Sequence, residues 1–367
     1  MLTETGDKWT RATLSGKTGR VAFCFGTLFH RSLKLFIPAL VRRAFACYND
    51  ECTGEAVARL GGPRRVKRRA LWYGVCPETR EKRMFIANGW KDFEVLDTGS
   101  GEKLERWGNY LLARPDPQVI WPRGDEGLWQ KAQAHYTRSD RGGGAWEFKD
   151  RLPEKWVVSY GGLKFYVRPT GFKHTGLFPE QAANWDAMAG MLKKRPGARV
   201  LNLFAYTGGA TLACAAAGAH VTHVDAAKGM VLWAKENREL SGLPESSFRF
   251  IIEDALAFVK REIRRGSHYD GIVMDPPSYG RGPTGEVWKL ENELYTLVST
   301  CAGALSGDPL FFFINSYTTG FQPAVLQNIL QKTVAAQYGG TIDSQELCLP
   351  VRSGGVLPCG ATGRWSR

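Results

Sequence analysis

From Arg199 onward, short apolar stretches alternate with longer stretches that have helical periodicity, and this alternation constrains the fold most strongly. Alternating strands and helices are typical of βαβ units, which place parallel strands in one sheet with helices on both faces. We therefore expect an α/β fold with a doubly wound, mostly parallel, Rossmann-like sheet. Strands are expected at 199–204, 220–225, 248–252, 269–274 and 310–315.

Helices are expected after each of the first three strands, and another is expected to begin near Glu286. Pro323 fits the first turn of a further helix, because that position leaves the backbone N–H unpaired in any case. The chain ends in the β-prone stretch 341–351 and a last short strand. Sheets of this kind bind ligands at the carboxyl ends of their strands, so the residues that follow each strand are the candidates for a site.

Before this region the sequence predicts a small β-rich domain at 84–170, followed by the α/β domain at 171–367. Gly161 and Gly162 separate two β-prone runs, which indicates a hairpin with a two-residue turn. Six of the twelve tryptophans fall between 84 and 160, and they either fill the core of this small domain or stack on the bases of single-stranded RNA. These six are Trp90, Trp107, Trp121, Trp129, Trp146 and Trp156.

The net charge of +13 is concentrated near the N-terminus, where residues 1–83 hold 17 of the 49 basic and 7 of the 36 acidic residues. The run from Gly61 to Trp72 suggests an arm that binds RNA phosphates. The acid-free basic stretch from Lys8 to Arg43 also fits an organellar transit peptide. A third interpretation is that the natural start is Met84. Residues 1–83 are thus a basic extension, either disordered or a mis-called start.

Several classes of protein are not indicated by this sequence. No apolar stretch reaches the ~18 residues of a membrane-spanning helix, and no secretory signal is visible. The eight cysteines lack the spacing of a disulfide framework, and Cys47 and Cys52 have no second pair or histidine cluster that would complete a zinc site. We therefore expect a cytoplasmic protein with reduced cysteines, without a membrane span or a bound metal.

The first candidate ligand site is NLFAYTGGA, which follows the strand that begins at Arg199. A dinucleotide fold would place Gly-x-Gly-x-x-Gly here, so that a pyrophosphate could lie against the helix N-terminus. This chain has only Gly208 and Gly209, preceded by the bulky Phe204 and Tyr206. Such a turn suits a ligand without phosphates that still approaches the backbone closely, and S-adenosylmethionine is such a ligand.

Three acidic residues follow successive strands. Asp225 can accept hydrogen bonds from both hydroxyls of a ribose, as acids at this position do in dinucleotide folds. Asp254 can hold the amino group of an adenine, and Asp275 precedes two prolines. Each acid alone is more often an ordinary helix cap. Three of them at consecutive strand ends, after an aromatic and glycine-containing turn, indicate a nucleoside site.

The stretches HTGLFPEQAANW, NLFAYTGGATLACAAAGAHVTHVDAAKGMVLWAKEN and DPPSYGRG occur here in one order. Together they resemble class I S-adenosylmethionine-dependent methyltransferases, and they are most similar to the bacterial family named for the 23S rRNA cytosine-C5 methyltransferase of the large subunit. The resemblance runs from about Trp90 to Arg367. It implies S-adenosylmethionine as cofactor, ribosomal RNA as partner and methylation of an RNA base as activity.

The resemblance also implies roles for the matching positions. Phe204, Tyr206, Thr207 and Gly208 would line the methionine end of the cofactor. Asn202 stands where many methyltransferases carry an acid for the methionine ammonium group. Asp225 would hold the ribose with Lys228 near it, and Asp254 and Ala255 would contact the adenine. Gln181, in LFPEQ, matches an upstream position that often faces the cofactor.

Pro276 and Pro277 have fixed φ angles and no backbone N–H, so the chain is expected to leave the strand as a stiff extended segment whose carbonyls point outward. In the family this turn lies between the methyl group and the target base. Asp275 and these carbonyls would then accept protons from an amino group. Tyr279 either stacks on an extruded base or anchors the loop. The alternative for the whole turn is a rigid loop that only caps the sheet.

Methylation of carbon 5 of a pyrimidine requires a nucleophile, usually a cysteine thiolate. Family members with this chemistry carry the cysteine where this chain has Asn315, Ser316 and Tyr317, and Cys301 is expected in the core. A nitrogen target needs only positioning and proton removal. Two alternatives to an rRNA methyltransferase stay open: a methyltransferase for a small molecule or protein, and a non-catalytic cofactor-binding protein. The sequence leaves the oligomeric state open.

Overall fold

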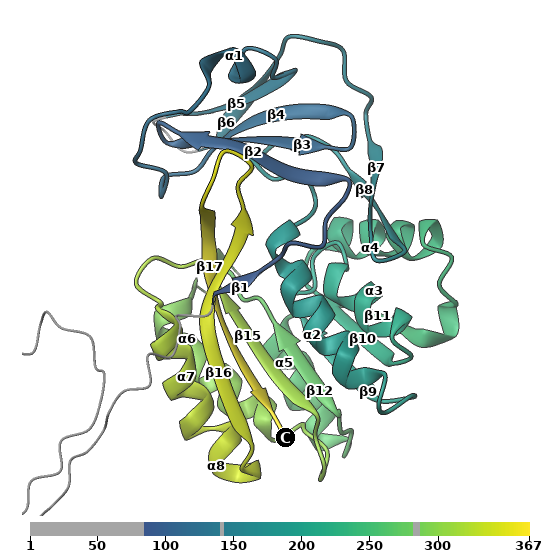
Figure 1. The fold of residues 1–367 in the computed structure, drawn as a ribbon. Coiled ribbons are helices and arrows are strands. Elements are labelled where there is room, and N and C mark those ends of the chain that lie inside the picture. The colour runs from purple at the N-terminus through teal and green to yellow at the C-terminus, as the bar shows by residue number, and fades with distance from the viewer. Residues whose placement is uncertain (1–83, 140–142, 282–286) are drawn as a thin grey trace, which may run out of the picture. The chain divides into compact units, whose positions relative to one another are not determined.

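The computed structural model describes residues 84–139, 143–281 and 287–367 (Figure 1). All of them fall in one of the two compact units of the chain, which spans Cys76–Arg367. The predicted basic extension at 1–83 lies outside the described residues. Across the described part of the chain, no helix combines the length and the apolar character that crossing a membrane requires.

The main sheet has eight strands in the order β1-β16-β17-β15-β12-β9-β10-β11. Five of its pairings are parallel and two, both made by β17, are antiparallel, so the predicted mostly parallel sheet is confirmed. Its strands are β1 (Phe85–Ile86), β9 (Arg199–Leu203), β10 (His220–Asp225), β11 (Phe248–Ile252), β12 (Gly271–Met274), β15 (Phe311–Ser316), β16 (Thr341–Pro350) and β17 (Val356–Ser366).

Helices cover both faces of this sheet. Successive residues of β15 show why, since Phe311 and Phe313 belong to one buried apolar cluster and Phe312 belongs to another on the opposite face. Central strands are therefore continuous apolar runs rather than alternating ones. The helices of this domain are α2 (Ala182–Leu192), α3 (Gly209–Ala216), α4 (Lys228–Leu240), α5 (Ala255–Arg264), α6 (Leu290–Ala302), α7 (Pro323–Lys332) and α8 (Val334–Tyr338), with short 3-10 turns at Pro179–Gln181 and Glu245–Ser247.

Two expectations about element bounds were wrong. Helix α6 begins at Leu290 rather than near Glu286, because Val287–Lys289 form strand β14, which pairs with β13 (Tyr279–Arg281). The last strand is not short: β17 has 11 residues. The glycines of β17 weaken the strand pattern in the sequence, so its length was not predicted. Gly360 is nevertheless needed in this strand, because a Cβ at this position would lie 2.8 Å from the carbonyl oxygen of Ser316.

A five-stranded sheet, β2-β3-β4-β5-β6, and the separate hairpin β7-β8 make up the β-rich part. The hairpin turns at Gly161 and Gly162, as predicted. Trp107, Trp129 and Trp156 are buried, which supports a core role for these three. The elements are β2 (Phe93–Gly99), β3 (Glu102–Trp107), β4 (Tyr110–Pro115), α1 (Glu126–Trp129), β5 (Ala134–Arg138), β6 (Gly144–Phe148), β7 (Trp156–Tyr160) and β8 (Leu163–Val167).

Candidate functional site

The turn between β9 and α3 has a strained backbone. Phe204 and Tyr206 have φ angles of 54° and 52°, and Gly208 has a φ of 90°. A left-handed conformation costs a residue with a side chain roughly 1–3 kcal/mol, and such strain tends to occur at ligand sites. The turn also lies close to α2, since a Cβ on Gly209 would be 2.5 Å from the ring of Trp185. The absence of a side chain at Gly209 thus lets α2 pack closely against the turn, and the close approach of a ligand to this backbone stays a prediction.

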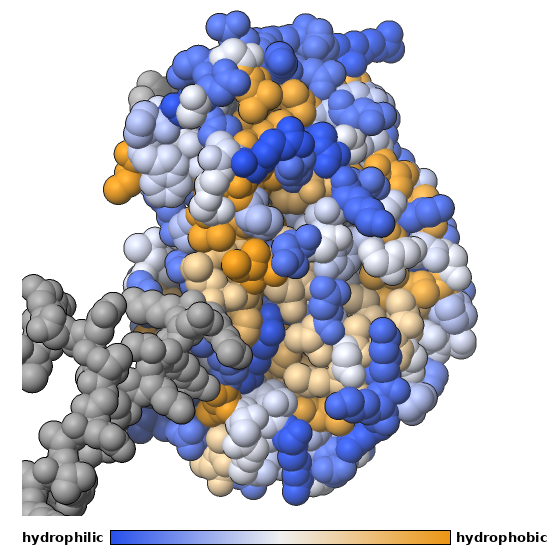
Figure 2. Space-filling view, in the orientation of Figure 1, coloured by the Kyte–Doolittle hydropathy of each residue, from blue (hydrophilic) through white to orange (hydrophobic). Residues whose placement is uncertain are grey.

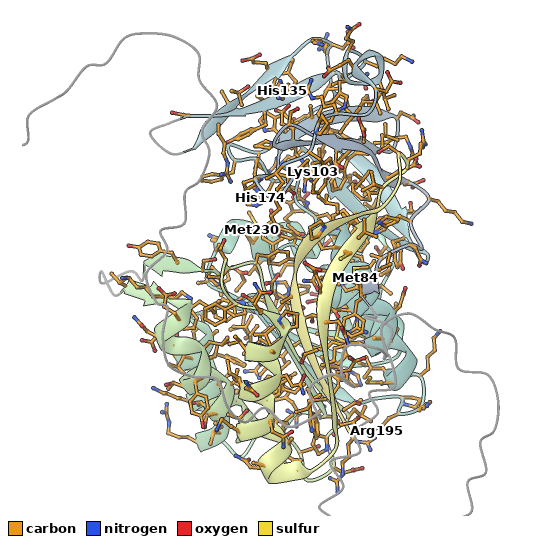
Figure 3. All side chains as sticks on the ribbon, turned by 60° about the vertical axis from the view of Figure 1, so that its left-hand side comes forward. Met84, Lys103, His135, His174, Arg195 and Met230 are labelled. Carbon is orange, nitrogen blue, oxygen red and sulfur yellow. The ribbon has the colours of Figure 1, made fainter. Side chains whose placement is uncertain are left out.

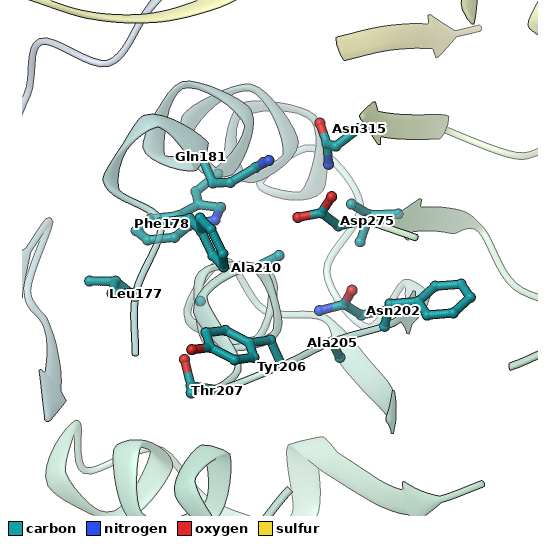
Figure 4. A pocket seen from close by; sticks show the side chains of 14 residues that line it. Leu177, Phe178, Gln181, Asn202, Ala205, Tyr206, Thr207, Ala210, Asp275 and Asn315 are labelled. Carbon is teal, nitrogen blue, oxygen red and sulfur yellow. The ribbon is translucent and has the colours of Figure 1, made fainter. Parts of the chain in front are cut away.

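This turn forms one wall of a hollow at the carboxyl ends of β9, β12 and β15 (Figure 4). The space between its walls is about 440 Å³, the open solvent at its mouth included. Six of the residues predicted from the sequence line it together: Gln181, Asn202, Phe204, Tyr206, Thr207 and Asp275. The other lining residues are Leu177, Phe178, Trp185, Ala205, Gly209, Ala210, Val273 and Asn315.

Asp225 does not line the hollow but is joined to its wall. Its carboxylate accepts hydrogen bonds from the backbone N–H of Tyr206 at 2.9 Å and of Ala227 at 2.8 Å. Burial nevertheless raises the pKa of Asp225, because these two donors do not fully compensate for lost water. Lys228 begins α4 beside this strand end and is exposed.

Asp254 and Ala255 lie one strand further along the same edge, outside the hollow. Asp254 is exposed and caps α5, since its carboxylate accepts a hydrogen bond from Ala257 N at 2.8 Å. The ordinary cap that the sequence also allowed is therefore present. The neighbouring Glu253 donates its N–H to the carbonyl oxygen of Asp225 at 3.2 Å, so these strand ends form a continuous rim.

A buried chain of hydrogen bonds orients Asn202. Its Nδ2 donates to Thr211 Oγ1 at 2.8 Å, and the Thr211 hydroxyl is hydrogen-bonded in turn to His223 Nδ1 at 2.9 Å. The other ring nitrogen of His223, Nε2, is buried without a partner in the described structure. Burial lowers the pKa of His223 to about 3, which keeps the ring neutral. The chain leaves Asn202 Oδ1, an acceptor, without a hydrogen-bond partner among the described residues.

Asp275 ends β12 and is half-buried in the wall of the hollow. Within the described residues no hydrogen-bond donor reaches its carboxylate. Burial, followed by the negative charge of the buried Glu180, raises the pKa of Asp275 to about 7. A carboxyl group with this pKa exchanges protons near neutral pH, which suits it to accept a proton during a reaction.

The double-proline turn is held from one side by the β13–β14 hairpin. Trp288 Nε1 donates to the carbonyl oxygen of Pro277 at 2.7 Å, and Leu290 N donates to the carbonyl oxygen of Ser278 at 3.1 Å. Of the carbonyls that were expected to accept protons from an amino group, that of Pro277 already accepts a hydrogen bond from Trp288. Pro276 is buried, whereas Tyr279 begins β13 and its side chain is 51% exposed.

Three residues of the site were not singled out from the sequence. The ring of Phe178 lies between those of Tyr206 and Tyr317, with centroid distances of 5.4 and 5.5 Å. Gln181 Nε2 donates to the Tyr317 hydroxyl at 2.8 Å, and Glu180 acts on Asp275 as described. Phe178 and Glu180 lie in the motif LFPEQ, from which only Gln181 was singled out. Tyr317 directly follows β15, and this strand-end position is the sequence signal that could have identified it.

None of the four described cysteines lines the hollow. Cys301 is fully buried in the core, as predicted, and burial raises the pKa of its thiol. Cys359 is half-buried, and burial together with the charge of Glu180 raises its thiol pKa well above the usual value. A thiolate nucleophile is thus not available from these residues. The described residues also contain no cluster of histidine, cysteine or acidic side chains that could hold a metal.

Comparisons with known proteins agree with this geometry. A family model described as S-adenosylmethionine-dependent methyltransferase matches residues 127–300. A crystal structure of a SAM-dependent methyltransferase from Agrobacterium tumefaciens is 40% identical, with a TM-score of 0.72, over 76% of this chain and 91% of that one.

Two curated relatives match over about half of this chain. A ribosomal RNA large subunit methyltransferase K/L from Syntrophotalea carbinolica is 30% identical over 49% of this chain and 25% of its own length. A ribosomal RNA large subunit methyltransferase K from Neisseria meningitidis is 28% identical over 51% of this chain and 50% of its own length. The chain spans half or less of the length of these relatives.

Proposed function

Because this chain belongs to the S-adenosylmethionine-dependent methyltransferases and uses S-adenosylmethionine as its cofactor, we propose that it methylates a base of ribosomal RNA. The names of the curated relatives support RNA as the substrate class. Such a substrate would place the enzyme in the cytoplasm. The observation that carries the proposal is the carboxylate of Asp275, which faces the hollow without a donor, opposite the strained turn after β9.

The residues of the hollow fit the cofactor. Asn202 Oδ1 is a free acceptor that the buried chain through Thr211 holds in place, and it would accept a hydrogen bond from the methionine ammonium group. Phe204, Tyr206, Thr207 and Gly208 would surround the methionine end, with Gln181 on the opposite wall. We assign Asp225 and Lys228 to the ribose, and Asp254 and Ala255 to the adenine.

When bound, S-adenosylmethionine supplies an electrophilic methyl group on its sulfonium. Asp275 would accept a hydrogen bond from an amino group of the base and then take the proton that this nitrogen loses as its bond to carbon forms. The rigid Pro276–Pro277 segment, fixed by Trp288, would keep the carboxylate in position. Tyr279 would stack on the base from the exposed side of the turn.

A nitrogen atom is the target that this chemistry favours. Transfer to carbon 5 of cytosine would need a thiolate, but none of the described cysteines lines the hollow and all four have raised thiol pKa values. Transfer to an amino nitrogen needs only an oriented lone pair and a proton acceptor, which Asp275 provides.

The test uses purified protein, methyl-labelled S-adenosylmethionine and total extract from a strain that lacks the gene. We expect label that nuclease releases and protease does not, followed by detection of one N-methylated nucleoside in rRNA by mass spectrometry. Label released by protease would indicate a protein substrate in place of RNA, and label in small molecules alone would indicate a small-molecule substrate. Label on carbon 5 of a pyrimidine would overturn the direct transfer to nitrogen.

A further inference from the structure

We propose that the loop 170–174, together with the end of β6, is the surface that binds the RNA strand beside the target base. The inference rests on the proposed function and adds a binding surface outside the hollow. Its central residues are Phe172, Lys173 and Phe148, and the expected occupant is single-stranded RNA. The β-rich part carries apolar residues at its surface among hydrophilic ones (Figure 2).

The loop is held rigidly while its aromatic side chain stays in solvent. Trp146 Nε1 donates to the carbonyl oxygens of Thr170 and Phe172, at 2.9 and 3.2 Å. Thr170 Oγ1 donates to the carbonyl oxygen of His174 at 2.8 Å. Phe172 is nevertheless 67% exposed. A fixed backbone that presents a large ring to water lowers the entropic cost of stacking a base on that ring.

A second exposed ring lies on the adjacent strand. Phe148 is 55% exposed, and its ring is nearly parallel to that of Trp146, with 25° between the planes and 6.3 Å between the centroids. Trp146 therefore supports Phe148 by its ring and Phe172 by its N–H. Two supported and exposed rings form a platform on which successive bases can stack, whatever their sequence.

The loop is continuous with the wall of the hollow. The ring of His174 lies 5.4 Å from that of Phe178, which lines the hollow and contacts Tyr206 and Tyr317. A row of aromatic rings thus leads from Asp275 to the exposed loop. RNA that inserts one base into the hollow would place its neighbouring nucleotides along this row.

The charge of the loop fits a phosphate. Lys103 and Arg114 are paired with Glu105, but within the described residues no carboxylate lies within ion-pair distance of Lys173. Burial, followed by the nearby cation of Lys103 (labelled with His174 in Figure 3), lowers the pKa of Lys173 to about 8. A bound phosphate would bring a negative charge to this lysine and favour its charged form.

The test compares Phe172→Ala, Lys173→Ala and the double variant with wild type in the full-length protein. Tyr295→Ala and Lys332→Ala are matched controls, because these residues are an exposed tyrosine on α6 and an exposed lysine on α7. Binding of single-stranded rRNA oligonucleotides is measured at several salt concentrations, together with the affinity for S-adenosylhomocysteine. That affinity should be unchanged in all variants.

We expect Phe172→Ala to weaken RNA binding and raise the KM for RNA about tenfold, the scale of one lost base stack, with kcat retained. Lys173→Ala should lower the slope of log affinity against log salt by about one phosphate contact. If both variants methylate RNA and their RNA affinity and salt slope equal those of wild type, the proposed RNA-binding surface is wrong but the proposed function remains intact. Absence of any RNA binding or methylation by wild type would overturn both.

Discussion

At the scale of single residues, Asp275 combines a position useful for chemistry with a cost to stability. Its carboxyl group lacks donors among the described residues, and burial raises its pKa to about 7 from an ordinary value of 3.8. The unfolded chain therefore releases this proton more readily than the folded one. Between pH 4 and pH 7, ionisation of Asp275 favours unfolding, which is the reverse of a salt-bridged carboxylate.

Asp275→Asn should therefore stabilise the protein while it removes the proposed proton acceptor. We expect the free energy of unfolding to rise by about 1–3 kcal/mol at pH 8, where the wild-type group is charged in both states. The difference should shrink as the pH falls toward 4, where the wild-type carboxyl is protonated when folded. Urea unfolding at the two pH values measures this, and a variant that is less stable at pH 8 would contradict the assigned environment.

A second prediction concerns the buried chain that orients Asn202. Thr211→Val keeps the volume but removes the hydroxyl between Asn202 and His223, so the amide can turn its nitrogen toward the hollow. We expect the affinity for S-adenosylhomocysteine to fall by about 1–2 kcal/mol, the scale of one charged hydrogen bond. Binding of 5′-methylthioadenosine, which has no ammonium group, is the control and should not change. Equal losses for both ligands would show general disruption instead.

The sequence identified some site residues because their positions at strand ends carry the information. Asn202 lies near the end of the apolar run of β9, and Asp275 directly follows that of β12. A parallel sheet brings such strand ends to one edge. Glu180 and Tyr317 were missed because their importance arises from contacts between segments 137 residues apart, which no local pattern encodes. The roles assigned to Asp225 and Asp254 stay predictions, since both lie at the rim.

At the scale of elements, the β13–β14 hairpin connects the double-proline turn to the strained turn after β9. The indole N–H of Trp288 donates to Pro277, and its ring lies 5.8 Å from that of Phe204. One side chain of β14 thus touches both walls of the site. A helix was expected to begin near Glu286, and the three residues Val287–Lys289 are too short a run to identify as a strand from the sequence alone.

Trp288→Phe keeps most of the ring packing but removes the donor to the Pro277 carbonyl. We expect kcat to fall about tenfold, since the turn that carries Asp275 loses its anchor, and the affinity for S-adenosylhomocysteine to stay within about twofold. Trp233→Phe is a matched control, because it removes a similar indole hydrogen bond whose acceptor, Tyr166 O, belongs to β8 and not to this turn. An equal loss of kcat in both variants would argue against a specific anchor.

Most strands and helices of the α/β domain were predictable for a physical reason. Central parallel strands are buried on both faces, so β12 and β15 appear in the sequence as continuous apolar runs. The length of β17 was not predictable, because its glycines are selected by contacts with β15 and α7 rather than by local preference. The proposed boundary between residues 170 and 171 stays a prediction.

At the scale of the whole molecule, a buried arginine connects the β-rich part to the loop that leads into the hollow. Arg114 on β4 binds Glu105 through two hydrogen bonds of 2.6 and 2.8 Å and also donates to the carbonyl oxygen of Lys173 at 2.8 Å. Burial alone would raise the pKa of Glu105, but Arg114 and Lys103 outweigh it and hold the pKa below its usual value. The stabilisation by the charged Glu105 is present above the ordinary pKa of glutamate and is lost as the pH falls through the lowered pKa of the folded state.

Glu105→Gln should leave the buried Arg114 without a counter-charge. We expect a loss of about 3–5 kcal/mol in the free energy of unfolding, the usual cost of breaking a buried pair. Glu94→Gln is the control, since Glu94 pairs with the exposed Arg352 and should cost less than about 1 kcal/mol. Both free energies of unfolding are measured with urea at pH 7. Similar losses in the two variants would show that burial does not make the Glu105 pair contribute more to stability than the Glu94 pair.

The most direct test of the account is single-turnover methyl transfer to rRNA by wild type and Asp275→Asn, measured beside the affinity of each for S-adenosylhomocysteine. The account predicts that transfer falls at least about 100-fold, the usual contribution of a general base, while the affinity changes less than about tenfold. Transfer within tenfold of wild type, or losses of transfer and affinity in equal proportion, would contradict the role of Asp275 as the proton acceptor.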